Sequence, residues 1–196
     1  MKYDLSKKTN RFAKRTLAAF SETLLELIKE ESFEDITINQ LCERCNYPRA
    51  TFYNYFEDIY DLLNYCFSLV QGVINIEYSY ELSEEERTMF LFEVFYDYLS
   101  GQKDVIKQIK QYNPADGVLM SCLWKYMKEQ VTSIMSECPY SKDLPVSQDI
   151  LVAHYSNTIQ LILEQSFFVK NSISKKEATE AIQFLIGSIE KEKWKK

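Results

Sequence analysis

Apolar residues recur along this chain at the spacing of one helix face, and strand-like alternation is rare. Leu17, Phe20, Leu24, Leu27 and Ile28 show the pattern near the N-terminus. Only four Gly and four Pro interrupt 196 residues, which favours long helices. The pattern predicts an all-α protein of about nine helices. These cover residues 9–31, 38–45, 48–54, 58–78, 84–99, 103–111, 114–138, 146–170 and 174–192.

Polar residues mark several helix ends. Thr37 and Asn113 can cap the helices that follow them, and Ser174 with Glu177 has the form of a capping box. Asn46 tolerates the left-handed conformation of a tight turn, and Pro48 suits the start of a helix. The sequence therefore predicts two short helices joined by a tight turn around Asn46.

Residues 37–56 have the organisation of a helix-turn-helix. Cys42, Cys45 and Ala50 are small and allow two helices to approach closely. In such a motif the second helix enters the major groove of DNA with its first residues on base edges. This segment predicts a DNA-binding head.

Charge is unevenly distributed. The whole chain has a net charge of −6, but residues 1–20 hold six cationic residues and one acidic residue, a charge of +5. The remaining residues therefore carry −11. Such a polarised molecule turns one end toward phosphates and repels them elsewhere.

The helix-turn-helix and its flanks follow an ordered pattern. It consists of Phe33, Ile36-Thr37-Ile38, Leu41-Cys42, Cys45-Asn46-Tyr47-Pro48, Thr51-Phe52-Tyr53, Tyr55-Phe56 and Leu62-Leu63. In order and spacing these residues resemble the tetracycline-repressor (TetR) family of bacterial regulators over residues 9–65. Downstream the chain is similar to the family only in layout.

The resemblance implies two domains. Residues 1–57 would form a three-helix DNA-binding domain, and residues 58–196 a helical ligand-binding and dimerisation domain. It implies a sequence-specific transcriptional regulator, a repressor released by a small-molecule effector. Two copies would pair through their last two helices and bind a palindromic operator in double-stranded DNA.

The resemblance also implies which residues contact DNA. Arg49 is the side chain near the bases that can bind guanine with two hydrogen bonds. Thr37 would bind phosphate, and cations of the first helix would add electrostatic attraction. The full set is Arg11, Lys14, Arg15, Thr37, Pro48, Arg49, Ala50, Thr51, Tyr53, Asn54 and Tyr55.

The chain departs from the family pattern at three positions. Asn46 and Ala50 stand where the family often has Gly, and both are tolerable replacements. Ile59, between Asp58 and Asp61, stands where the family usually has a phosphate-binding Lys. One phosphate contact is therefore lost, and we expect modest or strongly salt-sensitive affinity.

The second region is rich in aromatic residues, which predicts an apolar cavity or a packed core. A cavity would accept an apolar or flat aromatic effector. Its candidate lining is Phe67, Phe95, Tyr96, Trp124, Met127, His154 and Tyr155. Alternatively, this region binds a protein partner, which a filled core at Phe95, Trp124 and Met127 would favour.

Other classes of protein have little support. Cys42-x-x-Cys45 lacks the second ligand pair of a structural zinc site, and the chain has one His. Without a catalytic Ser/His/Asp order or a phosphate-binding Gly loop, we expect no enzyme, no metal and no cofactor. Neither a secretory signal nor a membrane span is recognisable, so we expect a cytoplasmic protein with reduced thiols.

Overall fold

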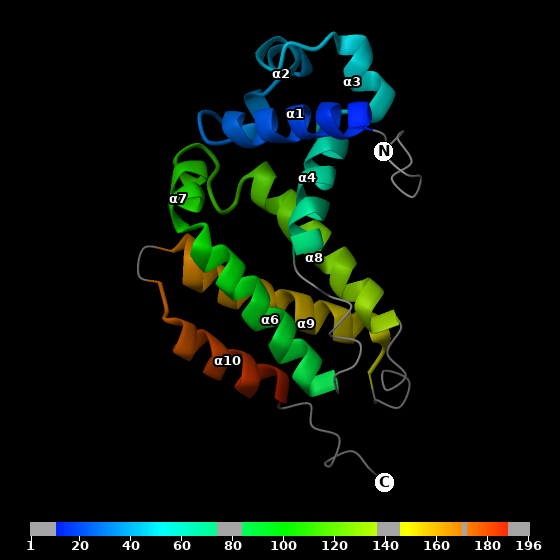
Figure 1. The fold of residues 1–196 in the computed structure, drawn as a ribbon. Coiled ribbons are helices and arrows are strands. Elements are labelled where there is room, and N and C mark those ends of the chain that lie inside the picture. Colours follow the sequence, from blue (N-terminus) through cyan, green and yellow to red (C-terminus); the bar gives the residue numbers. More distant parts are fainter. Residues whose placement is uncertain (1–10, 74–83, 137–145, 170–171, 188–196) are drawn as a thin grey trace. The chain divides into compact units, whose positions relative to one another are not determined.

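We analysed a computed structural model, which describes residues 11–73, 84–136, 146–169 and 172–187. Within these ranges the secondary structure is helical and contains no strand, which confirms the all-α prediction. The α-helices are α1 (Arg11–Leu27), α2 (Ile38–Arg44), α3 (Arg49–Tyr55), α4 (Ile59–Val73), α6 (Glu84–Gly101), α7 (Lys103–Tyr112), α8 (Val118–Ser136), α9 (Gln148–Leu163) and α10 (Lys175–Gly187) (Figure 1).

The helix predictions agree with the structure in order, and the differences are at the ends. The first helix stops at Leu27 and gives way to a turn and a 3₁₀ helix, Phe33–Asp35. α9 continues into a π-helical segment, Glu164–Phe168. None of the helices in the described ranges is long and apolar enough to span a membrane.

The prediction for α8 was wrong at its N-terminus. Asn113 does not cap this helix, which begins at Val118. Instead Gly117 donates its backbone N–H to the carbonyl of Pro114 at 2.9 Å, which closes a turn before the helix. The Asn113 side chain is occupied elsewhere, as the contacts below show.

The chain divides into two compact units. The first contains Met1–Val73 and Lys107–Cys122, and the second contains Ile74–Ile106 and Leu123–Lys196. α4 therefore belongs to the first unit, because Leu62, Leu63 and Cys66 are buried in that unit's core. The division into a DNA-binding domain of residues 1–57 and a ligand-binding domain of residues 58–196 concerns function and not packing, and it stays a prediction.

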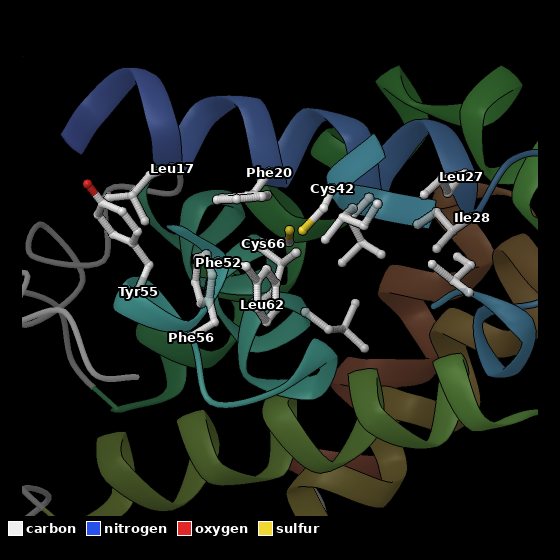
Figure 2. Close-up of a cluster of buried hydrophobic side chains, with 14 of the residues drawn as sticks. Leu17, Phe20, Leu27, Ile28, Cys42, Phe52, Tyr55, Phe56, Leu62 and Cys66 are labelled. Carbon is white, nitrogen blue, oxygen red and sulfur yellow. The ribbon is translucent and has the colours of Figure 1, made fainter. Parts of the chain in front are cut away.

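The core of the first unit is centred on Phe20 of α1, which has no exposed surface. Its ring meets Phe52 and Phe56 edge to face, with centroids 5.4 and 6.2 Å away. Tyr47, in the turn after α2, lies 5.4 Å away. Figure 2 shows Phe20 beside Phe52 and Phe56 within the buried cluster. Since aromatic pairs prefer such edge contacts, this group holds α1, the turn and α3 together.

The second unit has its own core, formed mainly by α6, α9 and α10. Phe92 and Tyr96 of α6 are buried with Leu163 and Ile182. At the surface, Lys175 of α10 donates to both carboxylate oxygens of Asp97 at 2.7 and 2.8 Å. The predicted capping box is present at α10, where Ser174 and Glu177 exchange hydrogen bonds.

We predict that Phe20→Ala lowers the free energy of unfolding of the first unit by about 3–5 kcal/mol, because the deletion leaves a cavity among three rings. Urea unfolding followed by circular dichroism measures this loss. Phe12→Ala is the matched control on the same helix, since Phe12 is 67% exposed; its effect is expected to stay within about 0.5 kcal/mol. Similar losses for the two variants would contradict the central role of Phe20.

Candidate nucleic-acid interface

Thr37 begins α2 and is exposed. Its hydroxyl oxygen accepts the backbone N–H of Gln40 at 3.2 Å, and the Gln40 side chain accepts the N–H of Thr37 at 3.4 Å. This reciprocal capping box fixes the Thr37 side chain at the helix start. The hydroxyl proton remains able to donate to an acceptor such as a phosphate oxygen.

The turn after α2 has the predicted left-handed residue. Asn46 adopts a φ of 56°, and among the described residues other than Gly it alone has a positive φ. Tyr47 then donates its N–H to the carbonyl of Cys42 at 3.0 Å. Because the Tyr47 ring packs on Phe20, the turn is anchored from both its backbone and a side chain.

α3 presents its first residues to solvent. Pro48 precedes the helix with a φ of −62°, and Arg49 and Ala50 are exposed. Arg49 Nη2 donates to the hydroxyl oxygen of Tyr53 at 3.2 Å, and its guanidinium carbon lies 5.8 Å from the centre of that ring. The guanidinium is thus held along the helix by a hydrogen bond and a cation–π contact.

The remaining predicted contacts differ in exposure. Asn54 is exposed, whereas Thr51 and Tyr53 are half-buried. A hollow in the surface beside the turn is lined by α2, the turn and the start of α3, with Glu43 and Arg49 as its charged residues. The start of α3 therefore borders a hollow that carries one acidic and one basic side chain.

The cations of α1 lie on its solvent-facing side. Arg11, Lys14 and Arg15 are exposed, while Ala13 and Leu17 between and beyond them are buried. The helix therefore separates its charged face from its core face. This arrangement makes the three cations available for long-range attraction of a polyanion.

Two comparisons with known proteins show what this chain is similar to. Residues 22–66 match the family model of the bacterial regulatory proteins of the tetR family. A solved protein of Syntrophomonas wolfei, assigned to the TetR-family transcriptional regulators, has the same fold with a TM-score of 0.63. It is 18% identical and the match covers 90% of this chain and 95% of that one. A search of curated proteins found no match.

Over residues 22–66 this chain is similar to the tetR family of bacterial regulatory proteins. This similarity supports a DNA-binding transcriptional regulator. The matched residues run from the middle of α1 into α4 and include Thr37, Arg49 and Tyr53, whereas Arg11, Lys14 and Arg15 precede them.

The burial of Tyr55 does not support its predicted contact with DNA. Tyr55 is only 8% exposed and its ring lies 6.5 Å from that of Phe56. Tyr53, two residues earlier, is on a different side of the helix because successive residues turn by about 100°. We therefore assign Tyr55 to the core and keep Tyr53 as a candidate contact.

The acidic start of α4 has a structural explanation. Asp58 Oδ1 accepts the backbone N–H of Asp61 at 2.8 Å, and Asp61 Oδ2 accepts that of Glu57 at 3.0 Å. Ile59, where the family usually has Lys, packs against the first core. Here the residues stabilise the helix start, since acids favour the N-terminal end of a helix.

Cys42 and Cys45 pack as small core-side residues. Cys42 is buried, and the Cys45 thiol points to the Cys42 carbonyl at 3.7 Å. Burial raises the pKa of both thiols, which leaves them protonated and poor nucleophiles at neutral pH. In the described part of the chain no three His, Cys, Asp or Glu side chains come together as a possible metal site.

Two contacts that hold α2 were not predicted from the sequence. Arg44 donates to both carboxylate oxygens of Glu30, from Nη1 to Oε2 at 2.5 Å and from Nη2 to Oε1 at 2.6 Å. This hydrogen bond lowers the pKa of the Glu30 carboxyl. The Gln40 side chain donates to Glu31. Partners 9 and 14 residues apart lie on different elements, so no helical spacing could reveal them.

The predicted effector residues do not form one cluster. Phe67 packs against the first unit's core. In the second unit, Tyr96 is buried and three other candidates pack against the same core, while Tyr155 packs with Leu151 and Val152. Those three are Phe95, Trp124 and Met127. Among the described residues, His154 Nε2 and Trp124 Nε1 are buried and find no hydrogen-bond partner.

We predict that Arg49→Ala relaxes the sequence preference at one base position of the DNA site by about 1–3 kcal/mol. The reason is the loss of the predicted contact between the guanidinium and a base. Lys14→Ala should instead weaken binding to all sequences alike, since phosphate contacts carry no sequence information. Fluorescence anisotropy on a preferred and a scrambled duplex separates these effects. Equal losses on both duplexes for both variants would refute the division.

Proposed function

We propose that this protein is a sequence-specific repressor that reads a palindromic operator as a homodimer and leaves it when a small molecule binds. The observation that carries the proposal is the exposed start of α3, where Arg49 is held over Tyr53 beside Pro48 and Ala50. A guanidinium fixed in this way loses little rotamer freedom when it binds guanine.

Around this reading helix, the other candidates would bind the DNA backbone. Thr37, Thr51, Tyr53 and Asn54 offer hydroxyl or amide groups, which suit phosphate oxygens. The cations of α1 would add a salt-dependent attraction. Because Asp58 and Asp61 occupy the start of α4, where they repel phosphates, we expect this attraction to be modest and to weaken as salt increases.

The last two helices are the proposed dimer interface. α9 and α10 contact each other in the second unit and leave large apolar side chains exposed. Phe184 of α10 is 77% exposed, and Ile150 and Leu161 of α9 are also exposed. Covering such side chains with the same surface of a second copy removes apolar area from water and gives a two-fold dimer.

The effector site is proposed in the second unit. Its aromatic side chains supply an apolar surface, and the unpaired nitrogens of Trp124 and His154 support a ligand with at least one polar group. The effector would act by binding one conformation of the dimer more tightly than the other. We retain residues 1–57 and 58–196 as the proposed reading and responding regions.

A protein partner in place of a small molecule is favoured by one observation. Phe95, Trp124 and Met127 pack against the second core, as in a filled interior. Mass spectrometry of the purified protein under native conditions distinguishes the two, since a small molecule adds a defined mass.

Selection from a random duplex library at moderate salt tests the proposed function. We expect a palindromic motif to be enriched, with half-sites about one or more helical turns apart. The Arg49→Ala variant is the control and should lose preference at one position in each half-site. Enrichment of no motif at low salt, with protein shown to be free of bound ligand, would contradict sequence-specific reading.

Phe184→Lys should convert the dimer to a monomer, because a buried lysine at the interface would be unpaired. Analytical ultracentrifugation measures the change as a halving of mass. Leu25→Lys, at an exposed apolar residue of α1, is the matched control and should remain dimeric. A dimeric Phe184→Lys protein would exclude this helix face from the interface.

A further inference from the structure

Asn113 is a polar residue buried in the first unit, far in sequence from the residues it contacts. It follows α7 and is 3% exposed. Its Oδ1 accepts the backbone N–H of Phe33 at 2.9 Å, across 80 positions of sequence. Its Nδ2 donates to the carbonyls of Ile28 and Glu31 at 2.9 and 3.1 Å.

These contacts involve both the nitrogen and the oxygen of the side-chain amide. An asparagine amide offers two N–H donors and one carbonyl acceptor. A third, longer contact runs from Nδ2 to the carbonyl of Ile109 at 3.4 Å, within α7 and its end. The partners also fix which way the amide faces, because a backbone N–H needs an oxygen and carbonyls need a nitrogen.

The backbone groups of residues 28–33 that Asn113 contacts lie directly before the helix-turn-helix in the sequence. Ile28 and Glu31 follow the last residue of α1, and Phe33 begins the 3₁₀ helix that ends one residue before Ile36. Thr37 comes next and caps α2. The Phe33 ring meets Tyr60 of α4 edge to face at 5.3 Å. Asn113 therefore holds the segment that sets the starting point of the helix-turn-helix.

The two helices that flank Asn113 along the chain, α7 and α8, both continue into the second unit. α7 begins in the second unit and enters the first at Lys107, and α8 leaves the first at Cys122 as one continuous helix. The link between them is tight, since a Cβ on Gly117 would approach the carbonyl oxygen of Pro114 to 3.1 Å. Asn113 thus lies at the start of a short connection between two helices that both continue into the second unit.

We propose that Asn113 is a positioning residue that couples the second unit to DNA reading, by tying the α7–α8 connection to the backbone before α2. This inference rests on the proposed function and names the route of its regulation. A shift of α7 or α8 that lengthens the hydrogen bonds to residues 28–33 releases the start of α2. Coupling between two sites is reciprocal, so DNA binding must also be sensed in the second unit.

Trp124 makes that reverse effect measurable. It lies on α8 in the second unit, and the chain has one other tryptophan, Trp194. With Trp194→Phe as background, Trp124 fluorescence is recorded while the protein is titrated with the duplex selected above. We expect a saturable change whose midpoint matches the DNA affinity measured by anisotropy.

Asn113→Ala and Asn113→Asp test the link itself. Asp keeps the shape and one acceptor oxygen but replaces the two N–H donors with a second acceptor, so it removes the hydrogen bonds to the carbonyls of Ile28 and Glu31. We expect both variants to lose at least about three-quarters of the DNA-induced change and to exchange the Phe33 amide proton about tenfold faster. Asn64→Ala, at an exposed asparagine of α4, is the control and should behave as the parent.

The outcomes are distinguishable. Failure of the parent protein to bind any duplex would overturn the proposed function, and this regulatory inference with it. DNA binding without a Trp124 response, or an unchanged response in folded Asn113 variants, would overturn the coupling alone. Should both variants unfold, NMR of ¹⁵N-asparagine-labelled parent protein decides: Asn113 side-chain signals that do not move on DNA binding would overturn it.

Discussion

The structure of the helix-turn-helix, α2 and α3, depends on the complete burial of Phe20 among the rings of Tyr47, Phe52 and Phe56. One ring of α1 contacts the turn, α3 and the residue that ends α3. Helices of seven residues are unstable in isolation. α2 and α3 therefore persist because their apolar sides are enclosed by α1 and α4, and the polar side of α3 is left to solvent.

This packing also decides which residues are available to DNA. With Phe52 and Tyr55 buried, Arg49 and Ala50 are exposed and Tyr53 is half-buried. Arg49 then has Tyr53 as its neighbour one turn along, and the pair forms a preorganised contact. The hydroxyl of Tyr53 thus supports the arginine as well as being a candidate phosphate ligand.

The acidic and basic parts of the chain have different roles in this arrangement. The exposed cations of α1 can attract the polyanion. Several acids near the head are used in its own structure: Asp58 and Asp61 hold the start of α4, and Glu30 holds Arg44 of α2. Exposed ion pairs contribute little stability by themselves. The Glu30 pair matters more for orienting α2 on the end of α1.

The sequence by itself determined the features that depend on neighbours along the chain. Helical periodicity, the Thr37 and Ser174 caps and the Asn46 turn were predicted, because each is a relation between residues within one or two turns. The spacing of the helix-turn-helix residues was sufficient to predict the family resemblance, which the match over residues 22–66 confirms. Helix ends were less well predicted, since α1 stops early where the backbone is bound from outside the helix.

Only the tertiary structure decided the relations between distant residues. Asn113 looked like a helix cap, yet its amide satisfies backbone groups some 80 residues earlier. Tyr55 was predicted to contact DNA, but it is buried. Its side chain is turned by about 100° around α3 from that of the preceding residue, Asn54, which is exposed. Phe67 looked like part of the aromatic effector set and packs in the other unit. A linear pattern gives the type of side chain and its local spacing, but its partner depends on which elements the fold brings together.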